Sequence, residues 1–155
     1  MARQGYKEIT IEVPEGWEDR SVIVFTAPPK VGRAAAPNVV LTRDVLPPGQ
    51  SLRTFATKEL AKIAQNLKGF DLIETKERNI DNALAIEHRF SWQGQTGPVI
   101  QRLLYIEREG TVHNITVSAA RADMKDADPT FERIIASAMI APKTTAPRVP
   151  PPRTS

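Results

Sequence analysis

Two histidines are the only imidazole side chains in the sequence, and cysteine is absent. His88 and His113 lie in no His-x-x-His or His-Glu-x-x-His pattern, the spacing that brings two metal ligands together on one helix. Without cysteine there is no thiolate nucleophile, no Cys-ligated metal site and no disulfide. The favoured interpretation seats both histidines in or beside a sheet, and a catalytic or metal-binding role is the alternative.

The acidic side chains also lack a catalytic or metal-binding pattern. The run at residues 123–128 has no central glycine and no terminal glutamate, both of which a calcium loop of the EF-hand type requires. We expect it to cap a helix and to carry solvated charge. Glu87 and Arg89 are each expected at the surface, where an opposite charge on a neighbouring strand would contribute a few tenths of a kcal/mol, and an acid–base pair is the alternative. No phosphate-binding loop or nucleophile elbow occurs. We therefore predict no enzymatic activity, no metal site and no cofactor.

The charge balance argues against nucleic acid as a partner. The 155 residues contain 21 Lys and Arg against 18 Asp and Glu, which gives a net charge of +3. This excess equals the cations after residue 141, namely Lys143, Arg148 and Arg153, so the remaining chain is formally neutral. A nucleic-acid binder would carry a basic patch on its folded body. No stretch is apolar enough for a membrane span or a secretory signal, so we expect a cytoplasmic protein that is not membrane-embedded.

The hydrophobic pattern predicts an α+β fold with a mostly antiparallel sheet of about seven strands and two packed helices. The predicted strands cover residues 6–13, 21–27, 38–43, 71–79, 84–92, 99–108 and 111–119. A helix is expected from Ser51, as N-cap, to residue 67, and a second with Asp128 as N-cap and Pro129 at its first position. We assign residues 1–141 to one domain and residues 142–155 to a proline-rich, disordered tail.

The predicted sheet has more apolar surface than two helices can cover. In the strand at residues 21–27, Val22 and Val24 alternate with Ile23 and Phe25, so both faces are apolar. Either the sheet curls on itself to bury this surface, or part of one face is an apolar groove that awaits a partner. The sequence alone leaves both possibilities open.

The order of several short motifs is recognisable. It resembles the DcrB-related domain family, and the closest match within it is to the effector-associated gene (Eag) chaperones of bacterial type VI secretion. The motifs are Pro-Glu-Gly-Trp at residues 14–17, Asp-Arg-Ser at 19–21 before the apolar strand, Thr-Arg-Asp at 42–44, Leu-Lys-Gly-Phe at 67–70, and Gln-Arg-Leu-Leu-Tyr-Ile-Glu at 101–107. The likeness spans roughly residues 6–139.

This resemblance implies a PsbP-like α+β fold, a homodimer without catalytic activity, and a cytoplasmic location. It further implies that the partner is the N-terminal transmembrane region of a PAAR-containing type VI secretion effector, which the chaperone shields before loading on the secretion spike. The client-binding residues that carry over are Val22, Val24 and Leu67. The alternative is a non-catalytic DcrB-like structural or adaptor domain without a transmembrane client.

Hydroxyl side chains could line such a groove and imitate the packing of membrane helices against one another. The candidates in this sequence are Ser21, Thr26, Thr42 and Ser118.

Overall fold

The computed structural model describes residues 2–33 and 35–142. The described residues fall into two compact units, one that contains residues 2–20 and one that contains residues 21–141. The predicted tail lies, apart from Pro142, outside the described residues, and its boundary at residue 141 stays a prediction.

The first unit contains a β-hairpin. Strands β1 (Ala2–Tyr6) and β2 (Ile9–Val13) pair antiparallel, with Tyr6 opposite Ile9. Lys7 has a φ of 51° in the connecting turn. The sequence pattern had indicated one strand over residues 6–13. The turn at Lys7 divides that segment, and the residues before it have no alternation that would have predicted β1.

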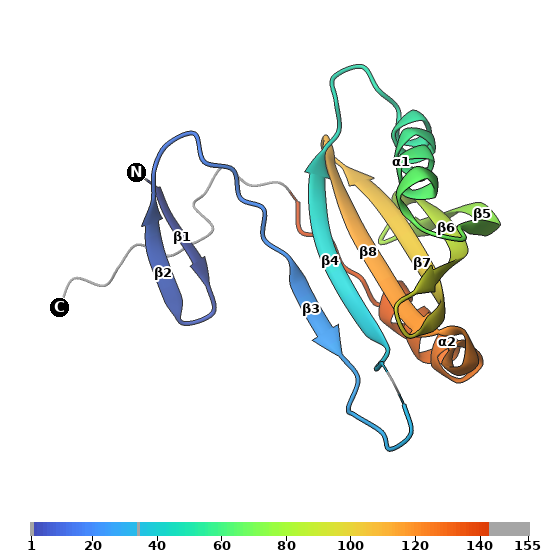
Figure 1. The fold of residues 1–155 in the computed structure, drawn as a ribbon. Coiled ribbons are helices and arrows are strands. Elements are labelled where there is room, and N and C mark those ends of the chain that lie inside the picture. Colours follow the sequence, from blue (N-terminus) through green and yellow to red (C-terminus); the bar gives the residue numbers. More distant parts are fainter. Residues whose placement is uncertain (1, 34, 143–155) are drawn as a thin grey trace. The chain divides into compact units, whose positions relative to one another are not determined.

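The second unit contains a six-stranded sheet in the order β3-β4-β8-β7-β6-β5, with every neighbouring pair antiparallel (Figure 1). Its strands are β3 (Ile23–Thr26), β4 (Asn38–Val45), β5 (Asp71–Ile80), β6 (Ala83–Gly94), β7 (Gly97–Arg108) and β8 (Thr111–Ala120). Tight turns join β5 to β6 and β7 to β8, and both require positive φ angles: 50° and 61° at Asp81 and Asn82, and 52° and 80° at Glu109 and Gly110. The α+β, mostly antiparallel prediction is confirmed, with β1 as the additional strand.

Helix α1 (Leu52–Asn66) begins as predicted. The Ser51 hydroxyl accepts a hydrogen bond from the backbone N–H of Thr54 at 3.1 Å, which satisfies a donor that the first helical turn leaves unpaired. The helix ends at Leu67, whose N–H donates to the carbonyl of Ile63. Leu52, Phe55 and other apolar residues of α1 pack against β6 and β7.

Helix α2 (Arg121–Ala136) begins earlier than predicted, directly after β8. The prediction that Asp128 caps the helix and Pro129 starts it was wrong, because both residues lie inside α2. The side chain of Met124 is buried in the core, so the first turn is held by packing. Pro129 removes one backbone hydrogen bond, to the carbonyl of Lys125, and both residues are exposed, where water can replace it.

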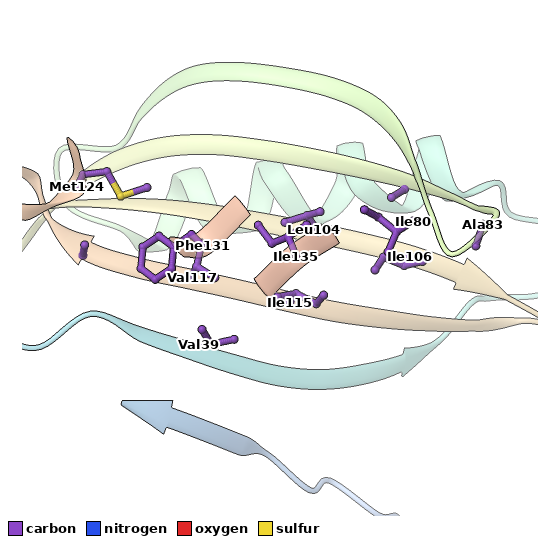
Figure 2. Close-up of a cluster of buried hydrophobic side chains, with 12 residues drawn as sticks. Val39, Ile80, Ala83, Leu104, Ile106, Ile115, Val117, Met124, Phe131 and Ile135 are labelled. Carbon is purple, nitrogen blue, oxygen red and sulfur yellow. The ribbon is translucent and has the colours of Figure 1, made fainter. Parts of the chain in front are cut away.

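The two helices cover opposite faces of the sheet. Phe131 and Ile135 of α2 pack over Leu104 and Val117, while α1 lies behind the strands (Figure 2). We call these the α2 face and the α1 face. α1 packs on β6 and β7, whereas α2 packs on β8 and β7 (Figure 1). Within the described residues, no helix combines the length and apolar character that a membrane crossing would need.

Candidate functional site

The α1 face changes from covered to open as it runs toward the edge strand β3. The strand register places Val24, Val40, Thr116, Leu103 and His88 in one row across the sheet. Leu103 and His88 lie in the part under α1 and are buried. At the other end of the row, the side chain of Val24 is 54% exposed. The same face therefore contains core at one end and solvent-accessible apolar surface at the other.

We call this accessible part the open surface. Val22, immediately before β3, belongs to it if the alternation of the strand continues, and it is 57% exposed. The register adds hydroxyl groups on the same face, because antiparallel partners share a face. The open surface thus comprises Val22, Val24, Thr26, Val40, Thr42, Thr116 and Ser118. Three of the four predicted hydroxyl residues lie here, and Ser21 falls outside β3.

Leu67 lies at the end of α1. Its half-buried side chain packs against the cluster that contains Phe90. Leu67 and Val24 are thus on the same face of the sheet, although one lies at the end of α1 and the other on the edge strand. In the strand order, β4, β8 and β7 lie between Val24 on β3 and Phe90 on β6, beside which Leu67 packs, so one copy of the chain does not bring the three predicted residues together. Their role in binding a client stays a prediction.

A polar network borders the open surface, and the sequence pattern had not indicated it. Trp92 Nε1–H donates to Gln101 Oε1 at 2.9 Å, and Gln101 Nε2–H donates to Ser118 Oγ at 2.7 Å. Asn114 Nδ2–H donates to the oxygen atoms of Thr42 and Asp44. These bonds hold amide and hydroxyl groups in fixed orientations beside apolar side chains. The resulting surface is apolar at its edge and polar toward the centre of the sheet.

On the α2 face, charged residues are buried under the helix. Arg102 is 2% exposed and Glu87 1% exposed, with Arg102 Nε 3.1 Å from Glu87 Oε2. Glu132 and Asp128 of α2 also pair with Arg102, at 3.1 and 2.8 Å. Glu87 does pair with opposite charges on neighbouring strands, Arg78 of β5 and Arg102 of β7, but the prediction that it lies at the surface was wrong. Arg89 forms an ion pair with Asp128 of α2, the helix whose start the sequence pattern had placed too late.

Neighbouring charges shift the pKa values in this cluster. Burial alone would lower the pKa of Arg102, but hydrogen bonds and charge from Glu87 outweigh it, and the pKa is raised. Hydrogen bonds from Arg78 and Arg102 lower the pKa of Glu132 to about 2, against a smaller opposing effect of burial. Arg102 and Glu132 are therefore charged at neutral pH. The ion pairs of the cluster tie α2 to β5, β6 and β7.

His88 is seated in the core of the α1 face, as expected. Its Nε2 lies 3.3 Å from the carbonyl oxygen of Ala56, and its Nδ1 lies 2.8 Å from Thr75 Oγ1. The carbonyl can only accept, so Nε2 carries the proton and Nδ1 accepts from the Thr75 hydroxyl. Burial lowers the pKa of His88. His113 lies in β8, opposite Arg43 of β4. In the described part of the chain, no three His, Asp or Glu side chains gather as a metal site would require.

Solved structures define the fold class. The chain is similar to the protein of unknown function PA94 from Pseudomonas aeruginosa, with a TM-score of 0.78, 22% identity, and 92% and 99% of the two chains covered. It is also similar to the PsbP protein CyanoP of Synechocystis, with a TM-score of 0.52, 13% identity, and 88% and 89% covered. LpqN, which is involved in cell envelope biogenesis of Mycobacterium tuberculosis, gives a TM-score of 0.52 at 15% identity, with 78% and 84% of the two chains covered. The protein therefore has a PsbP-like fold.

Comparison of the sequence identifies the family to which the chain belongs. The DcrB family model matches residues 8–137, and the chain belongs to the DcrB family. A curated relative, Effector EagT6 of Pseudomonas aeruginosa, is 26% identical over 126 residues, which cover 81% of this chain and 87% of the relative. The resemblance to DcrB-related and Eag proteins that the motifs had indicated is confirmed.

Proposed function

We propose that the protein is a type VI secretion effector chaperone, which binds the N-terminal transmembrane helices of a PAAR-containing effector on the open surface. It would act as a cytoplasmic homodimer and shield these helices before the effector is loaded on the secretion spike. The similarity to Effector EagT6 over most of both chains supports the class of protein. The observation that carries the proposal is the exposure of Val24, and of Val22 next to β3, at one end of a face whose other end is core under α1.

The chemistry of the open surface suits a transmembrane helix. Such a helix exposes about 20 apolar residues, which in water would aggregate or insert prematurely. Valine side chains on β3 and β4 offer apolar contact, while Thr42, Thr116 and Ser118 offer small hydroxyl groups. Helices in membranes pack against one another through the same combination of small and hydroxyl-bearing side chains. The open surface would replace those contacts in the absence of lipid.

The energy of such a contact limits how the client can be held. Burial of roughly 400 Å² of apolar surface at about 25 cal/mol/Å² contributes on the order of 10 kcal/mol. Association costs roughly 4–15 kcal/mol before any net affinity appears. One copy of the open surface would therefore bind a client weakly. Two copies that hold the same helix region would supply enough apolar contact, which is why the homodimer belongs to the proposal.

The alternative is a non-catalytic structural or adaptor domain that binds a soluble protein. Co-expression with a PAAR-containing type VI secretion effector that carries N-terminal transmembrane segments separates the two possibilities. The proposal expects the chain to co-purify with the whole effector and with its isolated N-terminal region. It also expects an effector that lacks the transmembrane segments, as matched control, to be lost. Equal retention of that truncated effector would favour the adaptor.

A further inference from the structure

The open surface becomes acidic along β4. The side chains of Val40, Thr42 and Asp44 follow one another on the α1 face, because alternate residues of a strand point to the same side. Asp44 is exposed, and its carboxylate accepts a hydrogen bond from the neutral amide of Asn114 at 2.8 Å. The same amide donates to Thr42 at 3.1 Å, so Asn114 links this carboxylate to the open surface.

A second carboxylate comes from α1. Glu59 lies one turn after Phe55, a buried residue of the helix, so it is on the side of α1 that faces the sheet. Its side chain is 31% exposed, and Lys62 lies 3.1 Å away with 69% of its side chain exposed. An ion pair with so exposed a lysine contributes little, and Glu59 retains the capacity to accept a further cation.

The hydroxyl of Tyr105 lies near both carboxylates. The residue is 3% exposed, and its ring packs edge-on against Phe55 with 5.5 Å between the centroids. Burial, and then the charges of Glu59 and Asp44, raise the pKa of Tyr105. Among the described residues this hydroxyl has no hydrogen-bond partner, and its oxygen retains some exposure to solvent. Because the hydroxyl of a buried tyrosine usually finds a partner, this oxygen is available to a ligand.

We propose that Asp44, Glu59 and the Tyr105 hydroxyl, which we call the acidic site, bind a basic side chain of the client next to its transmembrane segment. This inference deepens the proposed function and rests on it. Two carboxylates and a phenolic oxygen are acceptors for the three N–H donors of a lysine ammonium group.

The arrangement of the acidic site beside the open surface fits the end of a transmembrane helix. Lysine and arginine are common in the segments that flank membrane spans, and their apolar stems extend along apolar surface while the charge reaches a polar environment. Val40 and Asp44 lie on the same face, about 14 Å apart along β4. A helix whose apolar part contacts Val40 would therefore bring its cationic flank to Asp44.

Competition between two forms of one client tests this inference. The probe is the N-terminal region of a PAAR-containing effector, in which the residues that flank the transmembrane segments are all lysines in one form and all glutamines in the other. The two forms carry different tags, which are exchanged in a repeat, and both are co-expressed with the native chaperone. The ratio in which they co-purify measures their relative affinity. We expect the lysine form to be enriched roughly fivefold to tenfold, since hydrogen bonds between charged groups are at stake.

Variants of the chaperone assign this preference to the acidic site. The double variant Asp44→Asn, Glu59→Gln removes its charge and preserves its shape. The matched control is Asp126→Asn, Glu74→Gln, which makes the same two changes at exposed residues of α2 and β5. We expect the first double variant to retain both forms equally and the control to keep the native preference. Circular dichroism verifies that both are folded. Tyr105→Phe, which keeps the ring, should lower the preference and replaces the double variant if that does not fold.

Equal retention of the two forms by the native chaperone would overturn the inference, and this comparison needs no variant. A preference that is unchanged in the folded double variant, or in Tyr105→Phe if that takes its place, would overturn it as well. Retention of neither form by the native chaperone would instead contradict the proposed function, and the inference with it. The two failures are therefore distinguishable.

Discussion

The guanidinium of Arg102 and the carboxylate of Glu87 form a two-point ion pair, with Nε–Oε2 and Nη2–Oε1 distances of 3.1 and 3.2 Å. Both side chains are almost fully buried between the sheet and α2. Such a pair fixes the position of the helix, because a displaced partner would leave a charge in the interior without a counter-ion.

Replacement of Arg102 should therefore destabilise the fold strongly. Arg102→Met preserves much of the side-chain volume but leaves Glu87 buried with Arg78 as its remaining cation. We expect the free energy of unfolding to fall by about 3–5 kcal/mol, as measured by urea denaturation. Arg53→Met is the control, since Arg53 pairs with Glu77 at the surface and its loss should change stability little. Equal effects of the two substitutions would contradict the importance of the buried cluster.

The depressed pKa of Glu132 predicts a pH dependence. The pKa is lowered to about 2 in the folded protein, from the ordinary value of 4.5 for a glutamate. A carboxyl group with a depressed pKa contributes stability above pH 4.5, and this contribution is lost as the pH falls toward 2. We expect the native protein to be more stable than Glu132→Gln at neutral pH, and the difference to shrink between about pH 4.5 and 2. Glu132 is 44% exposed, so solvent reduces the size of this effect. A difference that is independent of pH would contradict the assignment.

His88 predicts a second pH dependence, in a different range. Burial lowers the pKa of His88 below the ordinary histidine value of 6.5, so the unfolded chain takes up a proton more readily than the folded one. Stability is therefore lost as the pH falls below 6.5. Gln can donate to the Ala56 carbonyl and accept from Thr75 without titrating. The stability difference between the native chain and His88→Gln should narrow from pH 7 to pH 5 in thermal denaturation. A widening difference would show that His88 gains its proton in the folded state.

The strands and α1 could be predicted because their signals are local. The alternation of apolar and polar residues predicted β4 to β8, and Ser51, the predicted N-cap, caps α1 in the structure. The start of α2 could not be predicted in the same way. Asp128 and Pro129 are a strong local start signal, but Met124 is buried and Asp128 forms an ion pair with Arg102, so tertiary contacts extend the helix toward β8.

The candidate site was only partly visible in the sequence. The apolar alternation at residues 22–25 indicated surplus surface, yet only the strand order shows that β3 is an edge strand and that its α1 face is open. The burial of Glu87 was missed because its partner, Arg102 of β7, is distant in sequence. The acidic residues of α2 that also pair with Arg102 are more distant still. A signal existed: Glu87 and Arg89 occupy the same face of a strand whose other face is apolar.

A charge placed on the open surface tests the central claim most directly. We compare Val22→Glu with Val45→Glu, a matched valine that is 79% exposed on β4 and lies, by alternation with buried Val39, on the α2 face. Both variants should fold and remain dimeric, because each new carboxylate stays hydrated. Binding of the effector's N-terminal region should weaken roughly 100-fold or more in Val22→Glu, since its charge must be desolvated against an apolar helix, and should be unchanged in Val45→Glu. Unaltered client binding by a folded Val22→Glu, or unfolding of that variant before any client is added, would contradict the account.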